Sequence, residues 1–339
     1  MVITDSSRSQ KRRMKSMRSI SNVRKNVADK KRKTIEGTAS ATIQYFFKHK
    51  NLYILLLPGL LHYILFRYVP LFGISVAFKD FSIYKGILNS PWVGLSNFEK
   101  FISSSDFTLL LKNTFILGFY GVVFTFPFPI IFAIFLNEMK LPRFQKIVQN
   151  VSFFPAMLSV VVVCSLVTDV LSPSTGVVNT ILKSLGLKSH YFMIDPKAFR
   201  SIYIISEIWS TFGYNAIVYL AALTNIDTQL YDAAHIDGCG RWKSIWHVTL
   251  PGLMTTICTM FVLNIGNVFK IGTDKIILLY NPMTYSVADV FGSFVYRKGL
   301  IEADYSYATA AGLFESVIAF IFVVTSNKIS KKLADARLW

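Results

Sequence analysis

Long apolar stretches recur along the chain and are separated by shorter polar connections. Six of them hold about 20 mostly apolar residues, the length that an α-helix needs to cross the hydrocarbon core of a bilayer. These segments are 52–77, 113–136, 148–171, 201–224, 248–270 and 306–326. The first is the least regular, because it contains His62, Arg67 and Pro70. The pattern predicts an all-α membrane protein with about six transmembrane helices.

Composition supports this prediction. Apolar and aromatic residues make up 53% of the 339 residues and charged residues only 16%, whereas soluble domains have about 45–50% and about 25%. No signal-peptide-like apolar stretch occurs within residues 1–40, so we expect the first apolar segment to remain as a membrane anchor. A soluble globular protein is therefore excluded.

The positive charge is concentrated at the N-terminus. The chain has a formal net charge of +17, and residues 1–51 contain 14 basic and three acidic residues. This segment lacks the apolar periodicity that would fold it, so we interpret it as a solvated arm that sets topology and contacts anionic lipid. A regulatory or nucleic-acid-binding arm is the alternative, but no aromatic residue precedes Tyr45 to stack on bases. We expect no nucleic-acid partner.

Basic residues also flank the last apolar segment. Lysine and arginine next to membrane helices are retained in the cytoplasm, so an even number of spans with both termini cytoplasmic fits. We therefore expect three parts: a basic cytoplasmic tail at 1–51, a transmembrane domain at 52–326, and a cytoplasmic C-terminal tail at 327–339. The domain would contain a cytoplasmic loop at 225–249.

This loop contains the most specific local pattern. Asp227 is a suitable N-cap, apolar residues follow at helical spacing, and Gly238 is a suitable helix-ending residue. The pattern predicts a short helix with little side-chain bulk at Ala233 and Ala234, which another protein could approach closely. Pro251 is expected in the first turns of the following span, where its missing N–H does least harm.

The loop resembles the cytoplasmic motif of permeases from binding-protein-dependent ATP-binding-cassette importers. That motif reads Glu-Ala-Ala, three residues, Gly, nine residues, Ile, one residue, Leu-Pro. Here Asp232-Ala233-Ala234, Gly238, Val248 and Leu250-Pro251 stand at the same spacing, with five of the seven defined positions identical. Segments 91–98, 280–282 and 310–313 are similar to the carbohydrate uptake branch (family 1), especially its oligosaccharide and polysaccharide permeases. The coupling residues carried over from the resemblance are Asp232, Ala233, Ala234, Ile236, Asp237, Gly238, Leu250 and Pro251.

The resemblance implies a type I importer permease fold in a bacterial cytoplasmic (inner) membrane. It also implies three partners: a second homologous permease, a dimer of ATPase subunits that receives the loop helix, and an extracytoplasmic solute-binding protein that delivers an oligosaccharide. On this hypothesis the chain binds no cofactor itself, and ATP and Mg²⁺ belong to the ATPase. The chain indeed has no Gly-x-x-x-x-Gly-Lys-Ser/Thr phosphate loop.

We expect neither a catalytic site nor a metal site. The cysteines, Cys164, Cys239 and Cys258, are widely spaced, and the histidines have no metal-ligand spacing. An enzyme working within the membrane would need a nucleophile or a metal cluster in its spans. The main alternative to the importer is a gradient-driven secondary transporter of a small polar solute, which would use acids inside the membrane. Glu207 is the clear candidate for such an acid.

Sugar passage requires hydrogen-bonding groups and aromatic faces inside the helix bundle, because an unpaired polar solute is costly in hydrocarbon. Polar residues within the fourth and fifth spans are therefore candidates for the translocation pathway. They are Glu207, Trp209, Tyr214, Asn215, Asn264, Asn267 and Lys270. Helix-to-helix hydrogen bonding is the alternative role for the asparagines.

Overall fold

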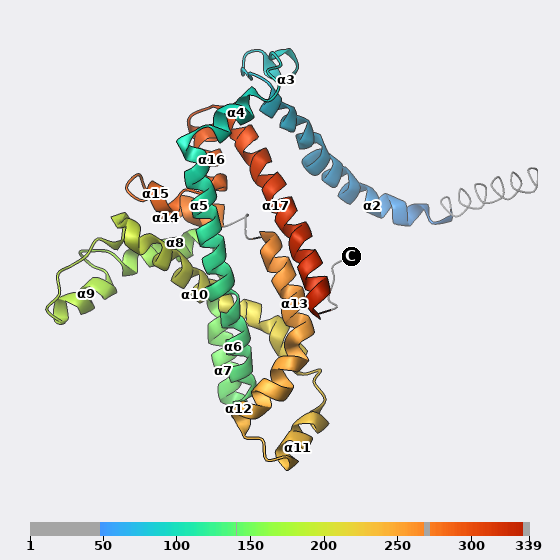
Figure 1. Ribbon diagram of the computed structural model, residues 1–339, viewed down its shortest axis with the longest axis vertical. Coiled ribbons are helices and arrows are strands. Elements are labelled where there is room, and N and C mark those ends of the chain that lie inside the picture. Colours follow the sequence, from blue (N-terminus) through green and yellow to red (C-terminus); the bar gives the residue numbers. More distant parts are fainter. Residues whose placement is uncertain (1–47, 140, 268–271, 335–339) are drawn as a thin grey trace, which may run out of the picture. The chain divides into compact units, whose positions relative to one another are not determined.

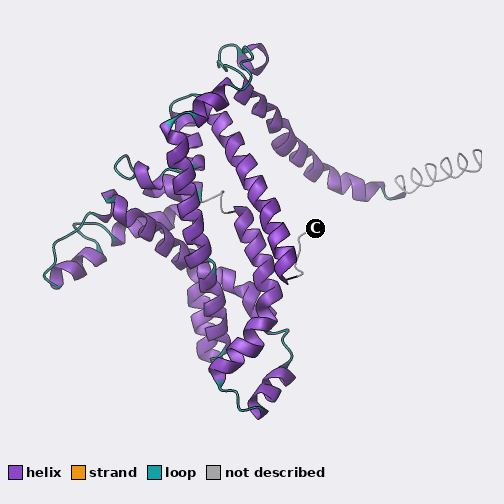
Figure 2. Cartoon of the chain, in the orientation of Figure 1, coloured by secondary structure: helices purple, strands orange, loops and turns teal. Residues whose placement is uncertain are grey.

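The computed structural model describes residues 48–139, 141–267 and 272–334. Within these ranges the protein is helical and has no strand beyond an isolated antiparallel bridge between Lys79 and Trp92 (Figure 2). The all-α prediction is therefore confirmed. The chain divides into two compact units, Met1–Gly73 and Ile74–Trp339, which are described separately. Most of the basic tail, including Lys30, lies outside the described residues.

Sixteen labelled α-helices lie in the described ranges, several joined end to end by π-helical or 3₁₀ turns. The α-helices are α2 (Lys50–Tyr63), α3 (Gly86–Asn89), α4 (Ser96–Ile102), α5 (Ser105–Tyr120), α6 (Pro127–Asn137), α7 (Pro142–Phe153), α8 (Val160–Val170), α9 (Val177–Ser184), α10 (Pro196–Leu223), α11 (Thr228–Ile236), α12 (Arg241–Ser244), α13 (Leu250–Asn267), α14 (Thr273–Leu279), α15 (Tyr285–Ala288), α16 (Phe291–Tyr296) and α17 (Tyr305–Ala334). The π-helical turns are η1 (Ile64–Tyr68), η3 (Gly121–Thr125), η6 (Ile245–Thr249) and η7 (Arg297–Ile301). The 3₁₀ segments are η2 (Val69–Phe78), η4 (Phe154–Met157) and η5 (Phe192–Ile194).

Four helical segments are long and apolar enough to cross a membrane. They are Lys50–Phe78, Ser105–Asn137, Arg241–Ile265 and Tyr305–Thr325. The first segment lies mostly in the Met1–Gly73 unit. The segment expected to be the fourth span forms the 28-residue helix α10, which is too polar to count among these four segments. The number of six spans therefore stays a prediction.

The expected third span, 148–171, is not one straight helix. The structure ends one helical segment at Met157 and begins α8 at Val160, with a bend of 102° between them. Ser159 caps α8 by accepting a hydrogen bond from the backbone N–H of Val162 at 3.3 Å. The apolar run therefore contains a helix start of its own, and the pair is either a broken span or a re-entrant loop.

Three π-helical turns come just before prolines. Pro70 follows η1, Pro127 follows η3, and Pro251 follows η6. Proline lacks the N–H that an α-helix uses, and its ring collides with the carbonyl four residues earlier. A local π-helical turn moves that carbonyl away, so the long helices continue through the prolines.

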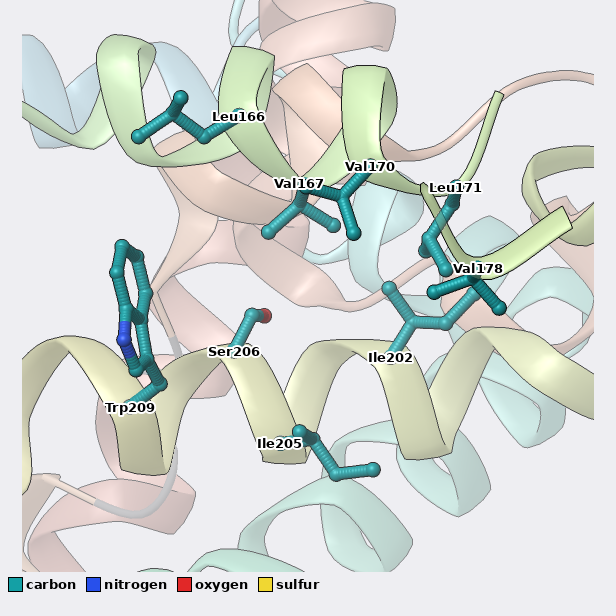
Figure 3. Close-up of a pocket in the computed structure, with 9 residues that line it drawn as sticks. All are labelled: Leu166, Val167, Val170, Leu171, Val178, Ile202, Ile205, Ser206 and Trp209. Carbon is teal, nitrogen blue, oxygen red and sulfur yellow. The ribbon is translucent and has the colours of Figure 1, made fainter. Parts of the chain in front are cut away.

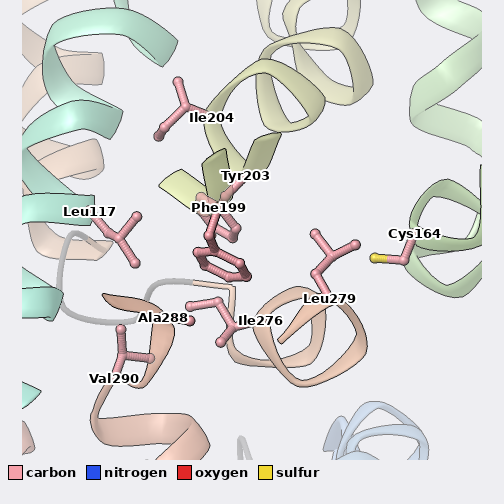
Figure 4. Packing of buried hydrophobic residues seen from close by; sticks show 9 residues of the cluster. All are labelled: Leu117, Cys164, Phe199, Tyr203, Ile204, Ile276, Leu279, Ala288 and Val290. Atoms are coloured by element: carbon pink, nitrogen blue, oxygen red, sulfur yellow. The ribbon is translucent and has the colours of Figure 1, made fainter. Parts of the chain in front are cut away.

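The second unit has several buried clusters. In one of them, α5, α8, α10 and α14 bring Leu117, Cys164, Phe199 and Ile276 together (Figure 4). In another, α6, α10 and α13 pack around buried Ala133, Ala216 and Leu253. Helix α17 packs along α13 and α16 and continues to Ala334, so it includes part of the expected C-terminal tail. Figure 1 shows α11 and α12 at one end of this unit and α4 and α16 near the other.

Candidate functional site

The short helix expected in the 225–249 loop is present as α11. Asp227 caps its first turn, because the Asp227 side chain accepts a hydrogen bond from the backbone N–H of Gln229 at 2.9 Å. At the other end, Gly238 has φ +73°, and the Cys239 N–H donates to the Ala234 carbonyl at 2.9 Å. Glycine adopts this left-handed conformation without steric cost, so it ends the helix and turns the chain.

Helix α11 contains no buried residue. Asp232, Ala233 and Ile236 are exposed, and Ile236 exposes 86% of its surface. The half-buried side of the helix is formed by Tyr231 and Ala234, one turn apart. The exposed face thus combines a small residue, an acid and a large apolar side chain, which suits contact with another protein better than contact with water.

The chain returns from α11 into one long helical segment. It begins at Arg241, passes through α12 and η6, and continues as α13. Leu250 is therefore at the first position of α13 but lies well inside the continuous segment, and the same is true of Pro251. Our expectation that Pro251 lies in the first turns of the span is wrong, because the helix starts earlier and tolerates the proline through the π-helical turn η6.

A polar pocket of about 300 Å³ lies where α8 and η4 face α10 and α14. Its polar lining consists of Glu207, Ser210, Thr211, Tyr214, Asn215 and Lys275. The Lys275 ammonium donates to Glu207 Oε2 at 2.8 Å, and the side-chain exposures are 4% for Lys275 and 33% for Glu207. The ion pair compensates the buried cation and leaves part of the carboxylate open to the pocket.

Helices α7 and α10 pack closely beside this pocket. A Cβ atom added at Gly213 of α10 would lie 2.1 Å from the backbone oxygen of Ser152 in α7. Any larger residue at Gly213 would push the two backbones apart, which is why a small residue is needed at the crossing. The approach places η4, with Pro155 and Ala156, opposite the polar face of α10.

The predicted pathway residues do not all meet in this pocket. Glu207, Tyr214 and Asn215 line it together, whereas Trp209 lines a separate apolar pocket of about 520 Å³ between α8, α9 and α10. Figure 3 shows Trp209 and Leu166 at one end of that apolar pocket. The remaining candidates belong to α13 or follow it in the sequence. Asn264 is exposed, Asn267 is the last residue of α13, and Lys270 lies outside the described residues.

Lys275 was not among the residues predicted from the sequence. It follows the end of the expected fifth span and belongs to the seven-residue helix α14. The available signal was a single lysine directly before the apolar run Ile276-Ile-Leu-Leu279. Its partner Glu207 lies 68 positions away, so the pairing depends on how α10 and α14 pack.

The connection from 272 to 304 contains a second charged network. Asp289 is bonded to Arg297 and accepts a hydrogen bond from the Ser293 hydroxyl at 2.6 Å. Burial raises the pKa of Asp289, while the bonds from Ser293 and Arg297 act in the opposite direction. Arg297 also lies over the ring of Tyr285, 4.9 Å from its centroid. Within the described ranges, no group of three His, Cys, Asp or Glu side chains could hold a metal ion.

Comparison with known proteins decides the family. The family described as "Binding-protein-dependent transport system inner membrane component" matches residues 125–338. The chain belongs to this family. This agrees with the resemblance that the Asp232–Pro251 motif indicated.

Two curated relatives of this permease are nearly as long as the chain. The polygalacturonan/rhamnogalacturonan transport system permease protein YteP of Bacillus subtilis (strain 168) is 37% identical over 91% of this chain and 100% of that protein. Protein LplB of the same organism is 38% identical over 86% of this chain and 92% of that protein.

A solved structure has the same fold as this permease. It is a bacterial ABC transporter involved in the import of the acidic polysaccharide alginate, with TM-score 0.80 and 39% identity. The match covers 86% of this chain and 98% of that chain. The protein is therefore an ABC importer permease with several membrane-spanning helices, and it belongs to a transport family and not to an enzyme family.

Proposed function

We propose that this chain is the transmembrane permease subunit of an ATP-driven importer for oligosaccharides or polysaccharide fragments in a bacterial cytoplasmic membrane. The names of its relatives support the substrate class. They include the polygalacturonan/rhamnogalacturonan permease YteP and the arabinooligosaccharide permease AraP of Bacillus subtilis (strain 168), the latter 27% identical over 84% of this chain. The chain forms half of the translocation pathway, and a second homologous permease forms the other half.

The main support for the proposal is the exposure of helix α11, which contains the first part of the family motif. It has no buried residue and presents Ile236 and Ala233 outward. The sequence has no phosphate loop, so the energy for uphill transport has to come from another subunit. We place ATP and Mg²⁺ on a pair of ATPase subunits that contact α11, and movement of α11 would then tilt the attached spans.

A solute-binding protein completes the importer. A related structure, with TM-score 0.80 and 38% identity, is described as a bacterial alginate ABC transporter in complex with an alginate pentasaccharide-bound periplasmic protein. By analogy, an extracytoplasmic binding protein delivers the sugar to this chain and its partner permease. Much of the substrate specificity then belongs to that binding protein.

The polar pocket is our candidate for a part of the pathway. Its carboxylate, hydroxyl and amide groups can exchange hydrogen bonds with sugar hydroxyls, which replaces the water that a sugar loses in the bundle. The exposed part of Glu207 and the side chain of Asn215 are the main contributors. Trp209 and Asn264 remain untested predictions for other parts of the pathway.

The test is purification of the tagged chain from its native membrane in a mild detergent, followed by mass spectrometry of the proteins that remain bound. We expect a second permease and an ATPase. The purified assembly in liposomes should take up oligosaccharide only when ATP and the binding protein are supplied. Recovery of the chain alone, with uptake driven by an ion gradient, would instead identify a secondary transporter.

A further inference from the structure

Helix α11 is joined to the rest of the chain by a specific hydrogen bond. The Tyr231 hydroxyl lies 3.1 Å from the Thr249 hydroxyl. Thr249 is the last residue of η6, directly before α13, and it is 1% exposed. Within the described ranges, Tyr231 is the side chain that bonds to the Thr249 hydroxyl. The bond therefore links the exposed helix to a buried point on the long helical segment.

A second contact lies just before α11. Ile226 packs against the buried cluster that contains Leu223 and Leu253. It fills the space beside Gly252 of α13, where an added Cβ would lie 2.7 Å from Ile226 Cδ1. Ile226 thus holds the residues just before α11 against the first turn of α13, next to Thr249.

The covalent route from α11 to α13 is less stiff. It passes through Gly238-Cys239-Gly240, and an added Cβ at either glycine would have nothing within 4 Å. Glycines give the backbone the most conformational freedom, and both glycines of this turn stand beside open space. A displacement of α11 is therefore passed to α13 more directly through Ile226 and through the Tyr231–Thr249 bond than along the backbone.

We propose that Tyr231 is a positioning residue for energy coupling: its hydroxyl, bonded to Thr249, transmits the movement of α11 to α13. This inference rests on the proposed function, in which an ATPase contacts the exposed face of α11. Tyr231 belongs to the opposite, half-buried side of α11. Its loss should therefore leave the ATPase bound while less transport follows each ATP hydrolysed.

The experiment compares the complete wild-type assembly with assemblies carrying Tyr231→Phe or Thr249→Val, reconstituted in liposomes with the binding protein. The readout is the amount of oligosaccharide taken up per ATP hydrolysed. Loss of one neutral hydrogen bond predicts a fall in this ratio of about fivefold in either variant. The double variant should fall no further, because both substitutions remove the same bond.

Matched variants separate coupling from folding. Thr249→Ser keeps a hydroxyl and should keep the wild-type ratio. Tyr84→Phe removes a hydroxyl from a tyrosine that is fully exposed elsewhere, and it should also keep the wild-type ratio. The ATPase should copurify with the Tyr231→Phe assembly in the wild-type amount.

The outcomes distinguish the two proposals. If no ATPase copurifies with the wild-type chain, the proposed function fails. If it copurifies and Tyr231→Phe keeps the full ratio, the coupling role of Tyr231 is wrong. It is also wrong if Tyr231→Phe releases the ATPase, because the hydroxyl would then act in docking.

Discussion

Helix α11 and the connection from 272 to 304 differ in how far their side chains find partners within the chain. Helix α11 has no buried residue and leaves Ile236 86% exposed. The connection buries charged groups and pairs them within the chain, as Lys275 with Glu207 and Asp289 with Arg297 show.

This difference separates two kinds of local structure in one subunit. In the connection, buried charges are compensated by the chain itself, so its structure depends on internal bonds. In α11, caps and a glycine fix the backbone, while the outward side chains have no partner among the described residues. If the proposed ATPase contacts α11, substitutions on this outward face should change assembly or coupling more than stability.

The largest expected effect comes from breaking the buried network. Asp289→Ala removes the buried carboxylate that pairs with Arg297 and leaves it with the more exposed Glu302, 3.6 Å away. Losing one partner of a buried pair costs about 3 kcal/mol or more. The side-chain exposures of Asp289 and Arg297 are 3% and 20%. We expect a clearly lower unfolding temperature of the detergent-purified protein, measured by differential scanning fluorimetry. Glu302→Gln, at a side chain that is 42% exposed, should change it little.

A smaller effect on stability but a clear effect on transport is expected at the end of α11. Gly238→Ala places an L-residue at φ +73°, which costs about 1–2 kcal/mol and alters the turn. If the loop conformation that contacts the ATPase becomes less stable by this amount, uptake should drop roughly tenfold. Gly240→Ala is the matched control, because Gly240 has φ −71° and open space around its Cα. Equal uptake by both variants would show that transport does not depend on the left-handed turn at Gly238.

The pocket offers a third test, between the two regions. Glu207→Gln keeps the size of the side chain but removes the charge that compensates Lys275 and weakens the acceptor facing the pocket. We expect uptake to fall about fivefold, the size of one weakened hydrogen bond, with the assembly intact. Trp209→Phe, two residues away but in the apolar pocket, should transport nearly as well as the wild type. A stronger loss of uptake with Trp209→Phe would indicate that the pathway lies along the other face of α10.

The smallest effect is a pH dependence at the start of α10. The backbone N–H of Lys197, and then the His190 ring, donate hydrogen bonds to Asp195 and lower its pKa below the ordinary value of 3.8. A carboxylate with a lowered pKa stabilises the folded state above pH 3.8, and this contribution is lost as the pH falls through the lowered pKa. The protection factors of the first-turn amides of α10, which compare intrinsic with observed exchange rates, should therefore fall in acid. Asp195→Asn keeps an acceptor and should remove this fall in protection.

Local features were readable from the sequence where one short segment contained the whole signal. The Asp227 cap and the Gly238 stop define α11 within twelve residues, and both are confirmed by the backbone. Apolar length likewise located the segments that became α5 with α6, α13 and α17. The coupling role of these residues stays a prediction until an ATPase is shown to bind.

Other features depend on contacts between distant residues or on caps inside an apolar run. Hydropathy alone joined 148–171 into one span, although Pro155 and Ser159 mark the break and the new start. The pairing of Lys275 with Glu207 could not be predicted, because it depends on how α14 packs on α10. Helical spacing did not separate Trp209 from Glu207, because it does not say which neighbour covers each face of α10.

The π-helical turn η6 also has a consequence for insertions and deletions. Such a turn accommodates one more residue than an α-helical turn, and each residue of an α-helix rotates the following face by about 100°. Deleting one residue from Ile245–Val248 would restore α-helical register and turn α12 toward a different side of α13, while Ile226 and Tyr231 keep α11 beside α13. Chain length between Arg241 and Pro251 therefore sets the direction in which α12 faces, whichever side chains fill these positions.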